Sequence, residues 1–305
     1  MSDKQLWPAG SREVTWISSA AMPNGTLRIA RTTSDGESSE VTWLTDSPHN
    51  DYKPVISIDG ARIAFFRTYR EDPSFYKWES AICVMAMDGS NLRELTDHTY
   101  MNTEPYWMRD GSDRIIWSRM VDAALGEQGT YAFWTRSDAQ PGDEEQISAT
   151  NREWINSGLR DGRVFIKRQN AYYLMRPNPG GQPVYEEISY PDSFHYLHKV
   201  VLSNDETMIA YMKKVDPGGD DYLGSEIVYA DFDAGAPAIS NEVAFSPHDE
   251  SKFSWYVSIA PDNSYLIFAE NGKIMQFDVA SGRTRQLSTR ADIQYRYPLI
   301  LGTTK

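Results

Sequence analysis

Two histidines near the middle of the chain, His195 and His198, stand three residues apart just before an apolar run. Imidazole titrates closer to neutral pH than any other side chain and also binds metal ions, so the pair is a candidate for acid–base chemistry or for metal coordination. In a strand, this spacing sends the two side chains to opposite faces, whereas a bent approach segment turns both in one direction. The element that carries the pair therefore decides its chemistry.

A metal site built on this pair would need a third ligand from elsewhere in the chain, such as His98 or Glu104. The sequence contains no complete ligand set of a known spacing, and we predict no cofactor. If a divalent ion does bind, the candidate ligands are His98, His195 and His198. As an acid or base, either histidine of the pair would act beside Tyr295 and Arg296, where the guanidinium would neutralise a sugar carboxylate during β-elimination.

The element that carries the pair belongs to a repeat. A short apolar run, a turn containing Asp and a second apolar run recur every roughly 40 to 60 residues, the length of one propeller blade. Clear examples are "KPVISIDGARIAFFR" from Lys53 and "SWYVSIAPDNSYLIFAE" from Ser254. An Asp-Gly or Asp-Asn turn between apolar runs predicts a β-hairpin. The corresponding turns contain Asp59, Asp110, Asp161, Asp205 and Asp262.

Each hairpin is followed by two further strand-like segments, which predicts blades of four antiparallel strands. The N-terminal region offers only three strands, and the C-terminal "YRYPLILGT" remains unclaimed, so joining them completes a sixth blade and closes the ring. We predict an all-β, six-bladed propeller in one domain, 1–305. Two β-sandwiches are the alternative, but they give no reason for a repeat throughout. The predicted blades are 10–46 plus 294–303, 51–97, 103–149, 153–189, 196–246 and 253–289.

The segments "SIDGARIAFFR" and "VMAMDGSNLRELTD" resemble the TolB-type propeller repeat, a WD40-like repeat also called PD40. This resemblance covers most of the chain and implies a six-bladed fold, with either ligand binding or protein recruitment at the rim. More distantly, the chain is similar to oligogalacturonate lyases, propellers with His, Tyr and Arg at the axial mouth. That likeness implies catalytic roles for His195, His198 and Tyr295. Here, however, the matching stretch reads His-Tyr-Leu-His and Glu104 stands where a histidine is expected.

The candidate binding residues lie where one blade leads to the next. All five histidines fall in these connections, and the residues that begin each inner strand converge on the propeller axis. Mixed charges and aromatic rings there suit a polar ligand with carboxylate or hydroxyl groups. Alternatively, the same charges pair with one another and plug the channel. The predicted substrate-binding residues are Lys53, Glu104, Arg152, Trp255 and Arg296, with Arg70 and Trp78 on a long neighbouring loop.

We therefore expect a polar small molecule or an oligosaccharide at the axial mouth, and the sequence leaves open whether the protein is an enzyme, such as a carbohydrate lyase. The alternative is a non-catalytic platform that binds a protein partner through Phe75, Tyr76 and Trp78. Small-molecule binding and partner capture are expected to depend on different residues. Loss of ligand affinity in a His198→Ala variant would favour small-molecule binding. Loss of partner capture in a Trp78→Ala variant would favour the protein-binding platform.

Composition excludes other partners. The net charge of −13 opposes binding to nucleic acid and to anionic membranes. No apolar stretch is long enough to cross a bilayer, and the N-terminus has no signal-peptide pattern. We expect a soluble cytoplasmic protein, although a leader removed before this sequence begins would leave the same pattern. The one cysteine, Cys83, lies in an apolar run and is expected to be a small buried residue.

Overall fold

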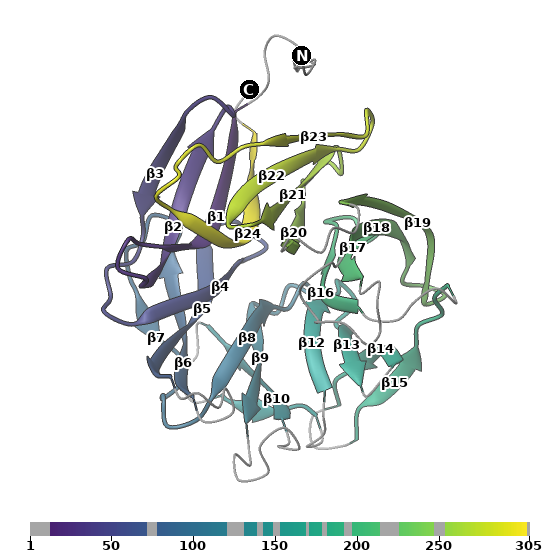
Figure 1. The fold of residues 1–305 in the computed structure, drawn as a ribbon. Coiled ribbons are helices and arrows are strands. Elements are labelled where there is room, and N and C mark those ends of the chain that lie inside the picture. The colour runs from purple at the N-terminus through teal and green to yellow at the C-terminus, as the bar shows by residue number, and fades with distance from the viewer. Residues whose placement is uncertain are drawn as a thin grey trace.

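The repeats form six four-stranded antiparallel sheets arranged in a ring, as Figure 1 shows for this computed structural model. The structure describes residues 13–71, 78–120, 131–138, 143–148, 153–168, 171–178, 182–191, 197–213, 226–246 and 254–303. The regular elements in these ranges are strands, so the prediction of an all-β, six-bladed propeller is confirmed. No helix in the same ranges has the length and apolar character that crossing a bilayer requires.

Each blade runs from an innermost to an outermost strand. Blade 1 consists of β24 (Gln294–Thr303), β1 (Val14–Ala21), β2 (Leu27–Ser34) and β3 (Ser39–Trp43). Blade 2 consists of β4 (Asn50–Ile56), β5 (Arg62–Arg70), β6 (Glu79–Ala86) and β7 (Arg93–Glu94). Blade 3 consists of β8 (Asn102–Trp107), β9 (Arg114–Met120), β10 (Tyr131–Ser137) and β11 (Glu145–Gln146).

The remaining blades follow the same order. Blade 4 consists of β12 (Glu153–Gly158), β13 (Val164–Arg168), β14 (Ala171–Arg176) and β15 (Val184–Glu187). Blade 5 consists of β16 (Leu197–Leu202), β17 (Met208–Lys213), β18 (Glu226–Asp233) and β19 (Ala238–Ser246). Blade 6 consists of β20 (Ser254–Ile259), β21 (Tyr265–Glu270), β22 (Lys273–Asp278) and β23 (Arg283–Gln286).

The C-terminal strand closes the ring, as predicted. β24 is the innermost strand of blade 1 and pairs antiparallel with β1, with Tyr295 opposite Ala20 and Thr303 opposite Val14. In Figure 1 the yellow C-terminal strand lies beside the purple N-terminal one. Because the first and last strands share a sheet, β1 is not left as the inner edge of blade 1, and β24 takes the innermost position.

The hydrophobic core lies between neighbouring blades. In β5 and β21 almost every side chain is buried, because both faces of these strands pack against other sheets. One cluster joins blade 1 to blade 6 and contains Trp16, Ile267 and Tyr295. Replacing a fully buried tryptophan such as Trp16 with alanine typically lowers the free energy of unfolding by about 3–5 kcal/mol.

The predicted Asp-containing turns join the first strand of a blade to the second. In blade 2, Asp59 accepts hydrogen bonds from the Ser57 hydroxyl (2.5 Å) and the Ala61 amide (3.1 Å), and Gly60 has a φ of 71°. The corresponding turns of five blades lie at one end of the channel, which we call the hairpin face. The connections from one blade to the next lie at the opposite end, the connector face.

Bulges interrupt the innermost strands at matching positions. In β4 the pairing with β5 shifts between Tyr52 and Val55, and similar shifts occur in the innermost strands of the other blades. A bulge inserts an unpaired residue, bends the strand and re-aims a side chain. Four non-glycine residues with positive φ mark these bulges: Lys53 (49°), Glu104 (55°), Tyr256 (45°) and Tyr297 (54°).

Candidate functional site

The connector end of the channel is narrowed by an ion pair. Lys53 Nζ lies 2.8 Å from Glu104 Oε2 and donates a 2.6 Å hydrogen bond to the Tyr106 hydroxyl. Lys53 is only 7% exposed. Burial lowers the pKa of Lys53 while Glu104 opposes that shift, and burial raises the pKa of Tyr106 with Glu104 acting in the same direction. The structure thus brings together two predicted binding residues as partners of each other.

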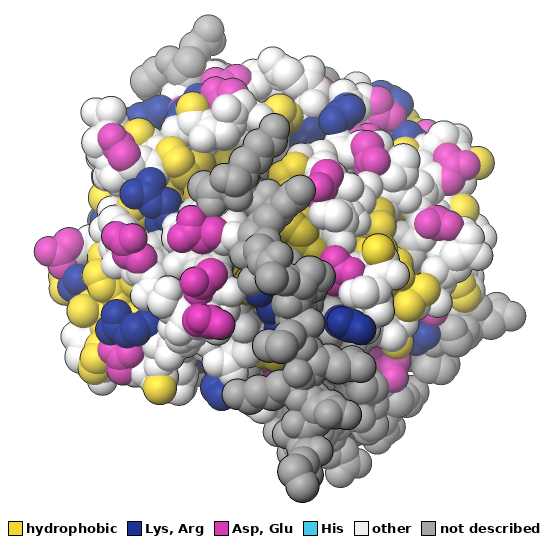
Figure 2. All heavy atoms as spheres, turned by 90° about the horizontal axis from the view of Figure 1, so that it is seen from above, with side chains coloured by type: hydrophobic (Ala, Val, Ile, Leu, Met, Phe, Trp, Pro, Cys, Tyr) yellow, Lys and Arg dark blue, Asp and Glu magenta, His cyan; other side chains and the backbone are white. Residues whose placement is uncertain are grey.

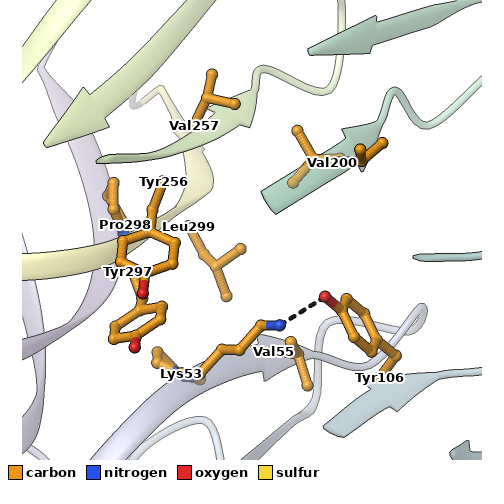
Figure 3. Close-up of a pocket in the computed structure, with 11 residues that line it drawn as sticks. Lys53, Val55, Tyr106, Val200, Tyr256, Val257, Tyr297, Pro298 and Leu299 are labelled. Carbon is orange, nitrogen blue, oxygen red and sulfur yellow. Dashed lines mark hydrogen bonds between the residues drawn. The ribbon is translucent and has the colours of Figure 1, made fainter. Parts of the chain in front are cut away.

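Below the ion pair the channel is a small apolar compartment of about 60 Å³, which holds no more than a few water molecules. Figure 3 shows Lys53 reaching toward Tyr106 across this compartment, with aliphatic side chains from several blades around it. Such a constriction is too narrow for a sugar-sized ligand. The apolar lining residues are Pro54, Val55, Val200, Val201, Val257, Pro298 and Leu299.

Besides Tyr106, two further tyrosines that sequence reasoning missed line the same compartment. The rings of Tyr256 and Tyr297 lie 3.7 Å apart between centroids, tilted by 32°. Sequence reasoning chose the preceding residues, Trp255 and Arg296, as the ones that reach the channel. A shift of one residue moves a side chain to the other face of a strand, and the bulges in β20 and β24 introduce that shift.

Tyr295 and Arg296 do not line the channel compartments. Tyr295 is 1% exposed, and its ring makes an edge contact with Trp16 in the core at a centroid distance of 6.0 Å. This burial raises the pKa of Tyr295. Arg296 is exposed and lies near enough to Tyr52 to act electrostatically on its hydroxyl. The structure therefore places Tyr295, a predicted catalytic group, in the blade interface.

The two predicted loop residues lie nearby but apart from the axis. Arg70 is exposed and forms a 3.3 Å ion pair with Glu79. Trp78 is half-buried, and its ring lies 5.7 Å from that of Tyr52, between the blade interface and a small methionine cluster. Neither side chain lines the two channel compartments.

Several predicted residues lie outside the part of the chain that the structure describes. These are His195, Arg152, Phe75, Tyr76 and the side chains of His198 and Trp255. His98 is exposed and stacks on Tyr69 at 4.3 Å, and His49 lies 4.7 Å from the same ring. Among the described residues, no group of three or more His, Cys, Asp or Glu side chains is arranged to hold a metal ion.

The larger compartment of the channel lies at the hairpin end. It has a volume of about 530 Å³ and is lined by the ends of the innermost strands of blades 1 to 6 and by several hairpin turns. Small residues such as Ser57, Gly158 and Ser258 leave this space open, and their positions near the ends of inner strands are a sequence signal that carries no information on how wide the space is. The polar side chains in the lining are Ser57, Arg109, Asn156, Ser157, Arg160, Asn204 and Ser258.

One arginine connects turns of two blades that are not neighbours. Arg109, in the hairpin turn of blade 3, donates hydrogen bonds of 3.0 Å to the Ser203 carbonyl and to Asn204 Oδ1 in blade 5. Blade 4 contributes the Arg160 amide, which donates to Glu206 Oε1 at 2.7 Å. These contacts hold three hairpin turns together around one side of the compartment.

Comparisons with known proteins give a fold and no family. No protein family model matches the sequence, and no curated protein matches it. TolB from Acinetobacter baumannii superposes with a TM-score of 0.68 at 13% identity, over 96% of this chain and 67% of that one. Hydrazine synthase from Kuenenia stuttgartiensis gives 0.63 at 12% identity, over 96% and 47%, and a chain of a nidogen/laminin complex gives 0.61 at 7%, over 94% and 98%. The chain thus has a TolB-type six-bladed propeller fold, and identities this low establish the fold alone.

Proposed function

We propose that this protein is a binding propeller that holds a polar small molecule, or one end of an oligosaccharide, in the axial compartment at the hairpin face. The observation that supports the proposal is the 530 Å³ compartment itself, which falls within the usual range of small-molecule sites, about 300–1,000 Å³. Polar side chains from several blades converge on apolar walls there, the usual composition of a ligand site. The proposal includes no reaction.

The two ends of the channel differ in what they offer to a ligand. At the connector face, Lys53 and Glu104 satisfy each other, and the apolar compartment behind them has room for water only. At the hairpin face, the lining carries donors and acceptors around a space large enough for a sugar ring. We therefore place the ligand at the hairpin end of the axis, whereas sequence reasoning placed it at the connector end.

The test is to narrow the compartment without touching the core. Ile58 lines the compartment and is 60% exposed, so an Ile58→Trp variant should fold normally and reduce the space at the hairpin mouth. Calorimetric titration with a panel of neutral sugars, sugar acids and sugar phosphates should find ligands of the wild-type protein whose affinity falls several-fold in this variant.

The matched control is Val184→Trp, because Val184 is 56% exposed on the outer strand β15 and lies away from the compartment. Ligand affinity should be unchanged in it. Equal affinity in the wild type and Ile58→Trp would place the ligand elsewhere, and an absence of binding across the panel would contradict the proposal. The same ligands are also titrated into a Lys53→Met variant, where a loss of affinity would indicate binding at the connector mouth.

A further inference from the structure

The charges that line the hairpin-side compartment are all of one sign. Among the described residues that line it, the charged side chains are Arg109 and Arg160, and no carboxylate is present. The whole chain carries a net charge of −13. On the face seen in Figure 2, Asp and Glu side chains are interspersed with Lys and Arg. A positive lining in an acidic protein is therefore a property of this compartment and does not follow from the composition.

One carboxylate, that of Glu206, lies near the Arg109 guanidinium and the Arg160 backbone. Glu206 Oε1 lies 3.8 Å from Arg109 Nη1, and the same oxygen accepts the Arg160 amide. The direct hydrogen bonds of Arg109 go to two neutral acceptors, the Ser203 carbonyl and the Asn204 side chain. The Arg160 side chain is exposed, and no described carboxylate lies within ion-pair distance of it. Among the described residues, the 3.8 Å separation between Glu206 Oε1 and Arg109 Nη1 is therefore the one ion-pair contact of the two side chains.

The surroundings of Arg109 also favour an added negative charge. Its side chain is only 16% exposed. Burial lowers the pKa of Arg109 and the charge of Arg160 acts in the same direction, against Glu206 and Asp205. A buried cation with incomplete compensation gains most from an anion, because the interaction is weakly screened there. Guanidinium groups bind carboxylates and phosphates through paired hydrogen bonds, which suits this position.

From this geometry we propose that the hairpin-side compartment is specific for an anionic ligand, a small molecule whose carboxylate or phosphate group is bound between Arg109 and Arg160. This inference rests on the proposed function and adds the charge class of the ligand. The amide of Asn156, 6% exposed in the lining, and the Asn204 side chain are positioned to bind the hydroxyl groups of the same ligand.

The experiment compares ligands that differ only in the acidic group. Glucose 6-phosphate, glucuronate and glucose are titrated into the wild-type protein by calorimetry at low and at high NaCl concentration. The acidic members should bind at least about tenfold more tightly than glucose, the gain expected from one charge-assisted contact. Added salt should weaken their binding and leave that of glucose unchanged. A preference for the phosphate or for the carboxylate identifies which acidic group the compartment selects.

Variants then locate the anion. Arg160→Gln should reduce affinity for the acidic ligands about tenfold, and Arg160→Lys should retain most of it. The matched control is Arg31→Gln, which changes the net charge equally but lies in a separate surface pocket together with Glu40. Arg160 is exposed, so its substitution should leave the thermal unfolding temperature unchanged.

The outcomes separate this inference from the proposed function. Anion specificity would be overturned, and ligand binding left intact, if glucose bound as tightly as glucose 6-phosphate and Arg160→Gln bound the acidic ligands as tightly as the wild type. Equal weakening by Arg31→Gln and Arg160→Gln would also overturn it, because only the net charge would then matter. If neither the three ligands nor any member of the wider panel used above bound, both proposals would be contradicted.

Discussion

The two ends of the axial channel are built from the same strands but differ in how their charges are paired and in how much space they leave open. At the connector end, the bulged residues of β4 and β8 supply Lys53 and Glu104, which neutralise each other in a confined space. At the hairpin end, the same two strands lead into turns that bring Ser57 and Arg109 to the open compartment, and Arg109 spans the turns of blades 3 and 5 without a tight acidic partner. In this chain the connector end of the axis is closed by paired charges, whereas the hairpin end keeps an open compartment.

The largest effect should come from breaking the pair at the connector end. Glu104→Leu leaves the buried Lys53 cation without its partner, and we expect a loss of about 3 kcal/mol in the free energy of unfolding, measured by chemical denaturation. The double variant Lys53→Met/Glu104→Leu removes both charges, so it should lie within about 1 kcal/mol of the wild type. A double variant as unstable as the single one would mean that the pair is not what stabilises this end.

The loss of stability in the Glu104→Leu variant should depend on pH with a definite sign. Burial lowers the pKa of Lys53 from its ordinary 10.5, so between the two values the unfolded chain binds more protons than the native one. Native stability therefore rises with pH in this window. Without Glu104 the pKa falls further, and the deficit of Glu104→Leu relative to the wild type should shrink as the pH rises toward 10.5. A deficit that grew with pH would contradict this account.

The fold was predictable because local signals agree with the global repeat. The Asp-containing turn and the apolar runs on either side of it recur in five blades, and a missing inner strand at one end matches a spare strand at the other. The pairing of Lys53 with Glu104 is one of the two alternatives that the sequence predicts, because the repeat places both residues near the starts of inner strands. The turns, the closing strand and this ion pair all follow from the spacing of residues along the sequence, so the sequence predicts them.

The position of the open compartment was not predictable in the same way. A bulge changes which of two adjacent residues faces the channel, so Tyr256 and Tyr297 line it where Trp255 and Arg296 were expected. The compartment at the hairpin face depends on how far apart small residues of different blades lie across the ring. The closed ring of blades sets that distance, and the polarity of the connecting loops does not predict it.

A smaller effect should come from removing the contact across the hairpin end. Arg109→Met keeps the apolar stem but loses the hydrogen bonds to blade 5, and we expect a loss of about 1–2 kcal/mol in the free energy of unfolding. Asn204→Ala removes one acceptor and should cost less. A double-mutant cycle of the two substitutions measures their coupling, and a coupling of zero would mean that the Asn204 contact adds nothing to stability.

The tyrosine pair at the connector end should contribute about 1 kcal/mol. Tyr297→Leu removes the ring contact with Tyr256 and should lower stability by about that amount, whereas Tyr297→Phe keeps the ring and should lower it less. Neither change should alter the affinity of a ligand bound at the hairpin end. A Tyr297→Leu variant that folded normally but lost ligand affinity would show that the two ends of the channel are not independent.

The smallest effect concerns acid stability at the hairpin face. The Ser203 hydroxyl donates to Asp205, as do the Asn263 amide and Thr207, and these hydrogen bonds hold the pKa of Asp205 well below its ordinary 3.8. A carboxylate with a lowered native pKa contributes stability that is present above 3.8 and is lost as the pH falls below it. The Asp205→Asn variant lacks this contribution, so its unfolding temperature should be slightly below that of the wild type at neutral pH, and the two should converge as the pH falls. Because this carboxylate is exposed the difference should be small, and a gap that widened in acid would show that the turn is stabilised in another way.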